Sequence, residues 1–444
     1  MKNLLILLLL LFAIGCATAE GPKPQTAVSQ GPSQEFQAVW KNPEGLLEAS
    51  KKYYDEGNYS LALTGLRRIA AAYPKSDVKP EAERLITDIQ TRMGTDHFKI
   101  GVLLPLTGSF ARFGEASLDG ISCAIGLFEP CGSPQSMVQI VVFDTKGSPS
   151  VAAAGVKELI EKEKVSALIG PLLSVDAPQA AQAAQNAGLP ILLLSPQENA
   201  TQAGDFVFQH SLVPDEEMRG LVNKIIEIGL KKFIVLYPKN RYGEQYKSLF
   251  AVYLQNRGAG KIIHETSYAP DIPDFLGIVE QAMQNRSDTA KLGIFVPDSY
   301  RQAGEIAQSL DTLSIQGPKL IGTSRWYHPQ LLSFPLPSLE GAILDTPFFA
   351  EADRPATRQF VETYAKAYGN PPAWLEAFGY DAARMILFAF GTKGEATGAG
   401  LRDALLAIHD FPSVVGPLSW NTSRISKWPL DFVTVKEGQF APLP

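Results

Sequence analysis

The five histidines are the side chains of this sequence best suited to proton transfer or metal binding. They are scattered, and none has a second histidine at the short spacing typical of zinc ligands. The sequence also lacks a glycine-rich phosphate loop and a Gly-x-Ser-x-Gly turn. The acidic run Asp215-Glu216-Glu217 is typical of a solvated helix start. We therefore expect no enzyme, no metal site and no cofactor; the histidines are His97, His210, His264, His328 and His409.

Cys16 follows an apolar run and is a candidate for lipid attachment. Residues 4–14 are apolar without a break, which is too short for a membrane span of roughly 20 residues but typical of a signal-peptide core. Ala13-Ile14-Gly15-Cys16 then resembles the bacterial lipobox. The resemblance implies a signal peptide at residues 1–15 and lipidation of Cys16. The alternative is ordinary secretion with an incidental cysteine.

Cys123 and Cys131 stand eight residues apart in a protein expected in an oxidising compartment. Such a pair favours a small disulfide loop. The alternative is two free cysteines, one of them buried in a helix.

The composition is that of an ordered protein with more than one folding unit. The chain has 444 residues, of which 45% are hydrophobic and 19% charged, and chains of this length usually form two or more units. Its formal net charge of -6 argues against a nucleic-acid partner, which would require basic clusters.

Two different segments precede the main body. Residues 16–40 are rich in Pro, Gln, Ser and Ala and read as a flexible tether. Residues 41–95 carry helical periodicity, and Ala62, Leu66 and Pro74 resemble part of a tetratricopeptide helix pair. A lone repeat of this kind is stable mainly when it is stacked. The segment is either a spacer docked on the main body or a surface for a protein partner.

From residue 98 onward, short apolar runs alternate with amphipathic helices. This alternation predicts parallel sheets with both faces covered, and the length favours two α/β lobes. The expected strands are residues 100–104, 138–143, 167–169, 190–194, 232–237, 292–296 and 319–321; the expected helices include 116–128, 150–163, 177–187, 216–228 and 300–310.

The order of several short motifs resembles the type I periplasmic binding proteins of the branched-chain amino-acid receptor class. The run at 99–108 resembles their first strand and loop, Gly170-Pro171 their third turn, Tyr242-Gly243 the first loop of the second lobe, and 416–420 their last crossover strand. The resemblance implies an α/β fold of two lobes, each with a doubly wound parallel sheet, joined by three crossings. We place lobe one at 98–211 and 345–414, and lobe two at 212–344 and 415–444.

Ligands of such folds lie beyond the carboxyl ends of the strands, in the cleft between the lobes. Ser174 matches the position of a hydroxyl that binds an amino-acid carboxylate, whereas the position of the ammonium-binding acid falls on Ser324, followed by Arg325. This departure weakens an amino-acid site, although Glu198 or Asp298 could supply the acid. The candidate cleft residues are Thr107, Phe113, Ser174, Gln197, Glu198, Asn199, Ser211, Tyr242, Asp298, Tyr300, Ser324 and Arg325.

At the positions that depart from the amino-acid receptors, the residues resemble those of a second group, the outer-membrane lipoproteins that activate penicillin-binding proteins. Pro196-Gln197-Glu198-Asn199, the stretch 211–219 and Thr323-Ser324-Arg325 resemble their motifs. This resemblance implies a non-catalytic lipoprotein that regulates peptidoglycan synthesis through contact with a synthase. In place of an amino-acid site, we expect the loop after Pro196 to fix the lobe orientation, with Asn199 bonded to Arg325 across the cleft. Ala17 after the lipidated cysteine, where Asp would retain the protein in the inner membrane, favours the outer membrane. The alternative is a receptor that binds an amino acid or similar polar ligand and feeds transporter permease subunits.

Overall fold

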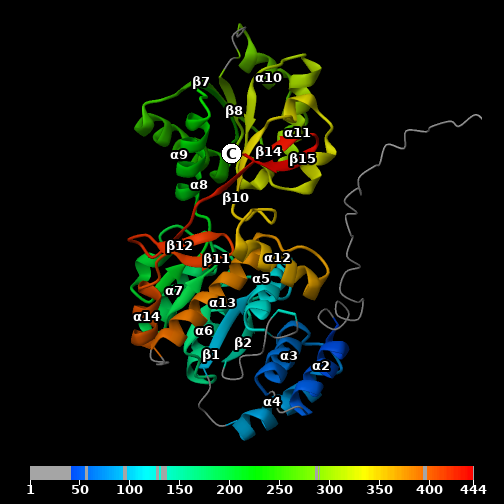
Figure 1. Ribbon diagram of the computed structural model, residues 1–444, viewed down its shortest axis with the longest axis vertical. Helices are drawn as coiled ribbons and strands as arrows, with labels where there is room; N and C mark the ends of the chain where they lie inside the picture. The colour runs from blue at the N-terminus through cyan, green and yellow to red at the C-terminus, as the bar shows by residue number, and fades with distance from the viewer. Residues whose placement is uncertain are drawn as a thin grey trace, which may run out of the picture.

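The protein consists of two lobes, one above the other, with a small group of helices beside the lower lobe (Figure 1). A computed structural model describes residues 42–55, 59–93, 98–126, 130–131, 138–285, 289, 291–393 and 398–443. The expected signal peptide, Cys16, the tether and His97 lie outside the described residues. In the described part of the chain, no helix combines the length and apolarity needed to cross a bilayer.

Lobe one is built on a five-stranded parallel sheet in the order β2-β1-β3-β4-β5. Ile100 and Val102 of β1 enter one apolar cluster while Leu103 enters another, as expected for a sheet covered on both faces. The strands are β1 (Phe98–Leu104), β2 (Val138–Asp144), β3 (Ala167–Ile169), β4 (Ile191–Leu193) and β5 (Val207–Gln209). The helices are α5 (Ala111–Ala124), α6 (Pro149–Glu161), α7 (Ala177–Asn186), α12 (Pro355–Tyr368), α13 (Trp374–Lys393) and α14 (Gly398–Leu406), with the 3-10 turn η1 (Ala200–Ala203).

Helices α5 and α13 bring the two chain segments of lobe one together, and each has a glycine where they meet. A Cβ on Gly120 would lie 1.9 Å from the Glu376 carbonyl oxygen, and one on Gly379 would lie 2.2 Å from the Ser117 carbonyl oxygen. Backbone atoms cannot yield this much space, so only glycine permits so close an approach.

Lobe two carries a seven-stranded sheet in the order β15-β14-β10-β9-β8-β6-β7. The sheet is mixed rather than wholly parallel as expected, because β14 and β15 form an antiparallel hairpin at its edge. Glu437 and Gly438 both have positive φ and make the two-residue turn of that hairpin. The strands are β6 (Lys232–Pro238), β7 (Lys261–Tyr268), β8 (Leu292–Phe295), β9 (Lys319–Ile321), β10 (Ile343–Thr346), β14 (Asp431–Lys436) and β15 (Gln439–Pro442). The helices are α8 (Pro214–Glu227), α9 (Arg241–Arg257), α10 (Leu276–Met283) and α11 (Tyr300–Thr312), with the 3-10 turns η2 (Ser324–Trp326), η3 (Pro329–Ser333) and η4 (Pro337–Leu339).

The chain passes between the lobes three times, after β5, after β10 and before β14 (Figure 1). The last crossing falls later than the expected boundary at 414/415. Strands β11 (Phe411–Ser413), β12 (Gly416–Trp420) and β13 (Ser426–Lys427) form a small antiparallel sheet, and Ile425 bridges to Gln209 of β5. Residues 416–420 are therefore a hairpin strand on lobe one rather than a crossover. The second crossing also follows Thr346 rather than 344, since β10 lies in the second sheet.

The helical segment is docked on lobe one. Helices α2 (Pro43–Asp55), α3 (Tyr59–Ala72) and α4 (Lys79–Met93) share an apolar cluster with the lobe, and α3 lies along the edge strand β2 (Figure 1). Arg67 of α3 donates to Glu163 at 2.9 Å, and Arg68 donates to Asp119 of α5 at 3.1 Å. Both arginines are almost fully buried. The segment thus covers a sheet edge that would otherwise be open to pairing.

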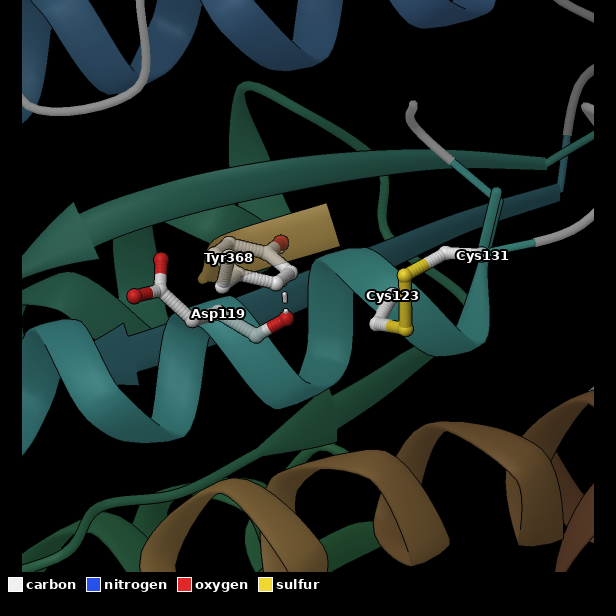
Figure 2. The surroundings of a disulfide bond; sticks show 4 residues. All are labelled: Asp119, Cys123, Cys131 and Tyr368. Carbon is white, nitrogen blue, oxygen red and sulfur yellow. Dashed lines mark hydrogen bonds between the residues drawn. A yellow bond between two sulfur atoms is a disulfide. The ribbon is translucent and has the colours of Figure 1, made fainter. Parts of the chain in front are cut away.

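A disulfide joins Cys123 to Cys131 at the carboxyl end of α5 (Figure 2). Cys123 is buried, and the two Cα atoms lie 4.9 Å apart, within the range a disulfide requires. One helical turn earlier, the Asp119 carbonyl accepts a hydrogen bond from the Tyr368 hydroxyl at 3.1 Å. The bridge therefore closes a small loop beside a well-packed part of lobe one.

We expect thiol labelling of the unreduced, denatured protein to find no free thiol at Cys123 or Cys131. Reduction should then lower the free energy of unfolding by about 2–3 kcal/mol, because the open loop adds entropy to the unfolded chain. Two reactive thiols before reduction would contradict this expectation.

Candidate functional site

A cleft of about 540 Å³ lies between the lobes. In both lobes the five parallel strands have the same order, β2-β1-β3-β4-β5 in lobe one and β7-β6-β8-β9-β10 in lobe two. The first strand of each lobe therefore lies second from one edge, between the second and the third strand. Loops at the carboxyl ends of such sheets form binding crevices. Seven of the expected residues line the cleft: Ser174, Gln197, Glu198, Ser211, Tyr242, Ser324 and Arg325.

Five expected residues do not line the cleft, because local partners hold them elsewhere. The Thr107 hydroxyl donates to Asp144 at 2.6 Å, and Phe113 packs beneath the Arg112 guanidinium. Asp298 accepts from the Tyr268 hydroxyl at 2.8 Å. Tyr300 stacks on His328 with ring centroids 4.2 Å apart, and Asn199 accepts from Gln202 at 3.0 Å.

Glu217 of α8 is a cleft residue that the sequence analysis did not single out. It is only 2% exposed. One carboxylate oxygen accepts hydrogen bonds from the Ser324 backbone N–H at 2.9 Å and from the Ser324 hydroxyl at 2.8 Å. The other oxygen accepts from the Tyr246 hydroxyl at 2.5 Å. Three protein donors therefore satisfy Glu217 before any ligand arrives.

Asp345, at the end of β10, lies beside Glu217 and is fully buried. No donor from the described residues reaches either of its carboxyl oxygens. Burial and the neighbouring Glu217 raise the pKa of Asp345 well above that of an ordinary aspartate. Asp345 therefore favours its protonated form, since no donor among the described residues stabilises its charge.

Two tyrosines that line the cleft, Tyr246 and Tyr242, lie near these two acids. Burial, together with the charge of Glu217, raises the pKa of Tyr246 and of Tyr242. Both hydroxyls therefore stay protonated, and the Tyr242 hydroxyl lies 2.8 Å from the Thr323 hydroxyl. The rings of Tyr242 and Tyr246 pack with centroids 4.1 Å apart. This network holds the loop 323–325 in place.

Two arginines on lobe two face the cleft. The Arg325 guanidinium lies 3.7 Å from the centre of the Tyr242 ring, and Arg241 is the first residue of α9. Both line the cleft. Among the residues that the structure describes, neither forms an ion pair with a carboxylate.

The loop after β4 contacts the opposite lobe, but not as expected. Gln209 donates to the carbonyls of Ser195 at 2.6 Å and Gln197 at 3.1 Å, which fixes this loop. Glu198 then accepts a hydrogen bond from Gln245 of α9 in lobe two. The expected bond between Asn199 and Arg325 is wrong, because Asn199 is held by Gln202 and Arg325 by the Tyr242 ring.

None of the described histidines lines the cleft. Burial lowers the pKa of His210 to about 3, and its Nδ1 lies 3.0 Å from the Ser426 hydroxyl, so it is a neutral core residue. The described ranges contain no group of three or more histidine, cysteine and acidic side chains that could hold a metal ion. The side chains that line the cleft are hydrogen-bonding, charged and aromatic.

Comparison with known proteins agrees with this architecture. Residues 97–438 match the family described as periplasmic binding protein. The chain is 26% identical over 379 residues to a penicillin-binding protein activator LpoA of Mannheimia succiniciproducens, which covers 83% of this chain and 57% of that relative. The chain thus spans less than two thirds of that relative's length. It is 23% identical over 329 residues to a Leu/Ile/Val-binding protein homolog 7 of Brucella melitensis, covering 70% of this chain and 81% of that protein.

A solved structure shares the fold. The crystal structure of a putative branched-chain amino acid ABC transporter protein from Rhodospirillum rubrum superposes with a TM-score of 0.71 at 23% identity, covering 78% of this chain and all of that one. The family match, the two lobes and the three crossings agree with one another. The chain belongs to the periplasmic binding protein family, in its type I class.

Proposed function

We propose that this chain is a non-catalytic, lipid-anchored envelope protein of the penicillin-binding-protein-activator type, which regulates peptidoglycan synthesis by contact with a synthase. The observation that supports this role most is the extent of the similarity. The alignment with the activator covers 83% of the chain, more than residues 97–444 contain, so it includes residues before the binding-protein module. Those residues belong to the helical segment or to its connection with lobe one, and the segment itself is held on lobe one by Arg67 and Arg68.

Cross-linking in the intact envelope tests this role. The chain, carrying a photoreactive residue in place of an exposed residue of α2 such as Lys52, should capture a peptidoglycan synthase identified by mass spectrometry. The same photoreactive residue in place of Arg257, at the far end of α9 in lobe two, serves as the control. Capture of transporter permease subunits instead of a synthase would reject the proposal.

A receptor role is the second candidate, because Ser174 lines the cleft and the chain resembles Leu/Ile/Val-binding proteins. The geometry at Glu217 disfavours it. A free amino acid needs an acid for its ammonium group, since an unpaired buried charge is costly. Glu217 is closed off by Ser324 and Tyr246.

We therefore expect no thermal stabilisation of the protein by leucine, isoleucine, valine or other common amino acids. A ligand present at about a hundredfold excess over its dissociation constant would add about 2.7 kcal/mol, which a melting curve detects easily. Ser174→Ala should leave cell-wall function intact. Stabilisation by a free amino acid that Ser174→Ala abolishes would favour the receptor.

We expect the Cys16→Ala variant to be released from the membrane, because the lipid would be its anchor. Membrane fractionation should place the unaltered protein in the outer membrane, facing the periplasm. Retention of the variant in the membrane would reject lipidation as the anchor, and recovery wholly with the inner membrane would reject the location.

A further inference from the structure

Two of the three segments that cross between the lobes are short, and each contains a buried ring. Residues 210–213 separate β5 from α8, and residues 428–430 separate β13 from β14. His210 has no exposed surface, and Trp428 is 8% exposed. In a binding protein that closes around its ligand, a few hinge residues absorb large changes in φ and ψ. Segments this short, held by buried rings, leave little room for such changes.

Side-chain and backbone contacts join the first crossing to the third. Gln209, at the end of β5, forms a β-bridge with Ile425. The His210 Nδ1 lies 3.0 Å from the Ser426 hydroxyl. The ring of Trp428 then packs on the ring of His210, with centroids 5.7 Å apart. The two crossings are therefore packed together as one unit.

An ion pair joins the second crossing to the third. The Arg354 guanidinium donates to both carboxylate oxygens of Asp431, at 2.7 and 2.8 Å. Asp431 is the first residue of β14 in lobe two, where it pairs with Thr346 of β10. Arg354 directly precedes α12 of lobe one, and its Nε donates to the Thr357 hydroxyl at 3.1 Å. That hydroxyl donates in turn to the Val414 carbonyl at 2.7 Å, so the arginine is fixed on lobe one.

This ion pair has the geometry and the burial that make such a pair effective. Most exposed pairs contribute little, because water screens them and two flexible side chains must be held in place. The side chains of Arg354 and Asp431 are only 24% and 17% exposed. Their bidentate contact is also directional, so a rotation of one lobe against the other would disturb both hydrogen bonds. By contrast, the nearby pair of Arg358 with Asp353 is 59% and 91% exposed.

We propose that Arg354 and Asp431 form an interlobe clamp that holds the two lobes in one orientation, so that the chain itself sets the shape of the cleft. The contact of Gln245 with Glu198 across the cleft acts in the same sense. A fixed arrangement of the lobes is pre-organised for a protein partner, because no ordering is needed on binding. The inference goes beyond the proposed function and does not depend on it, because it concerns the purified protein alone.

Interlobe distances measured by double electron–electron resonance test the clamp. Spin labels are attached through ketone-bearing amino acids in place of two exposed residues, Gln182 of α7 and Arg257 of α9, in the full-length chain in detergent. We expect one narrow distance when the clamp is intact. Arg354→Gln and Asp431→Asn should each raise the fraction of molecules outside that distance about tenfold, which corresponds to about 1.4 kcal/mol. A broad or double distribution with the clamp intact, or an unchanged distribution in either variant, would overturn the proposal.

A matched control and a double-mutant cycle separate the clamp from general effects of charge. Arg358→Gln removes the same charge from the exposed pair on α12 and should leave the distance narrow. Arg354→Gln combined with Asp431→Asn should broaden the distribution no more than either single variant, because both changes remove one contact. Equal broadening by Arg358→Gln, or additive broadening in the double variant, would reject the clamp.

Discussion

The Arg68→Met variant should lower the free energy of unfolding of lobe one by about 3–5 kcal/mol, the usual cost of leaving one member of a buried ion pair without its partner. Arg68 is 1% exposed and Asp119 7%, so the aspartate cannot recover its hydration when the guanidinium is removed. Methionine keeps the apolar stem and limits the cavity. Denaturant unfolding followed by tryptophan fluorescence measures the loss.

A double-mutant cycle separates the charge effect from packing. Adding Asp119→Asn to Arg68→Met should restore much of the loss, because no buried charge then remains unpaired. Arg84→Met provides the matched control. Arg84 pairs with Glu81 on the exposed face of α4, with 65% of its side chain exposed, and its removal should not move the unfolding midpoint. Similar losses in Arg68→Met and Arg84→Met would show that the buried pair does not hold the helical segment on the lobe.

The general fold could be predicted from the sequence because the patterns that indicate its strands and helices are local. The apolar runs that became β1, β2 and β6 are continuous, and such runs followed by helices predict covered parallel sheets. The fold of the last part of the chain was harder to predict from the sequence. Residues 416–420 have the apolar character of a crossover strand, but they pair with β11 and β13 through contacts that no local pattern reveals.

The cleft was predicted only in part, for a related reason. Position after a strand predicts that a residue lies at the cleft end of the sheet, and this was enough for Ser174 and Ser324. It does not predict which way the side chain turns, and Thr107 instead turns to Asp144. Glu217 was read as one of several acids at a helix start, because its partner Ser324 is 107 residues away in the sequence. Only the folded chain brings the two together.

The Asp345→Asn variant should be more stable than the unaltered protein at alkaline pH and equally stable in acid. The pKa of Asp345 in the folded protein is well above its ordinary value of 3.8. Between these two values the folded protein holds a proton that the unfolded chain has released, so stability falls as pH rises, by up to about 1.4 kcal/mol per pH unit. Asparagine has no titrating proton and therefore removes this loss.

The difference in free energy of unfolding between Asp345→Asn and the unaltered protein, followed as a function of pH, isolates the contribution of Asp345 from those of other titrating groups. Burial raises the pKa of Asp381 to about 7 as well, but Asp381 is present in both proteins and cancels in the difference. Asp271→Asn, an exposed aspartate of lobe two, serves as the control and should leave the pH profile of stability unchanged. The advantage of Asp345→Asn should be absent near pH 4 and should grow through the neutral range. Parallel stability curves from acid to alkaline pH would show that Asp345 does not retain a proton in the folded protein that it releases in the unfolded chain.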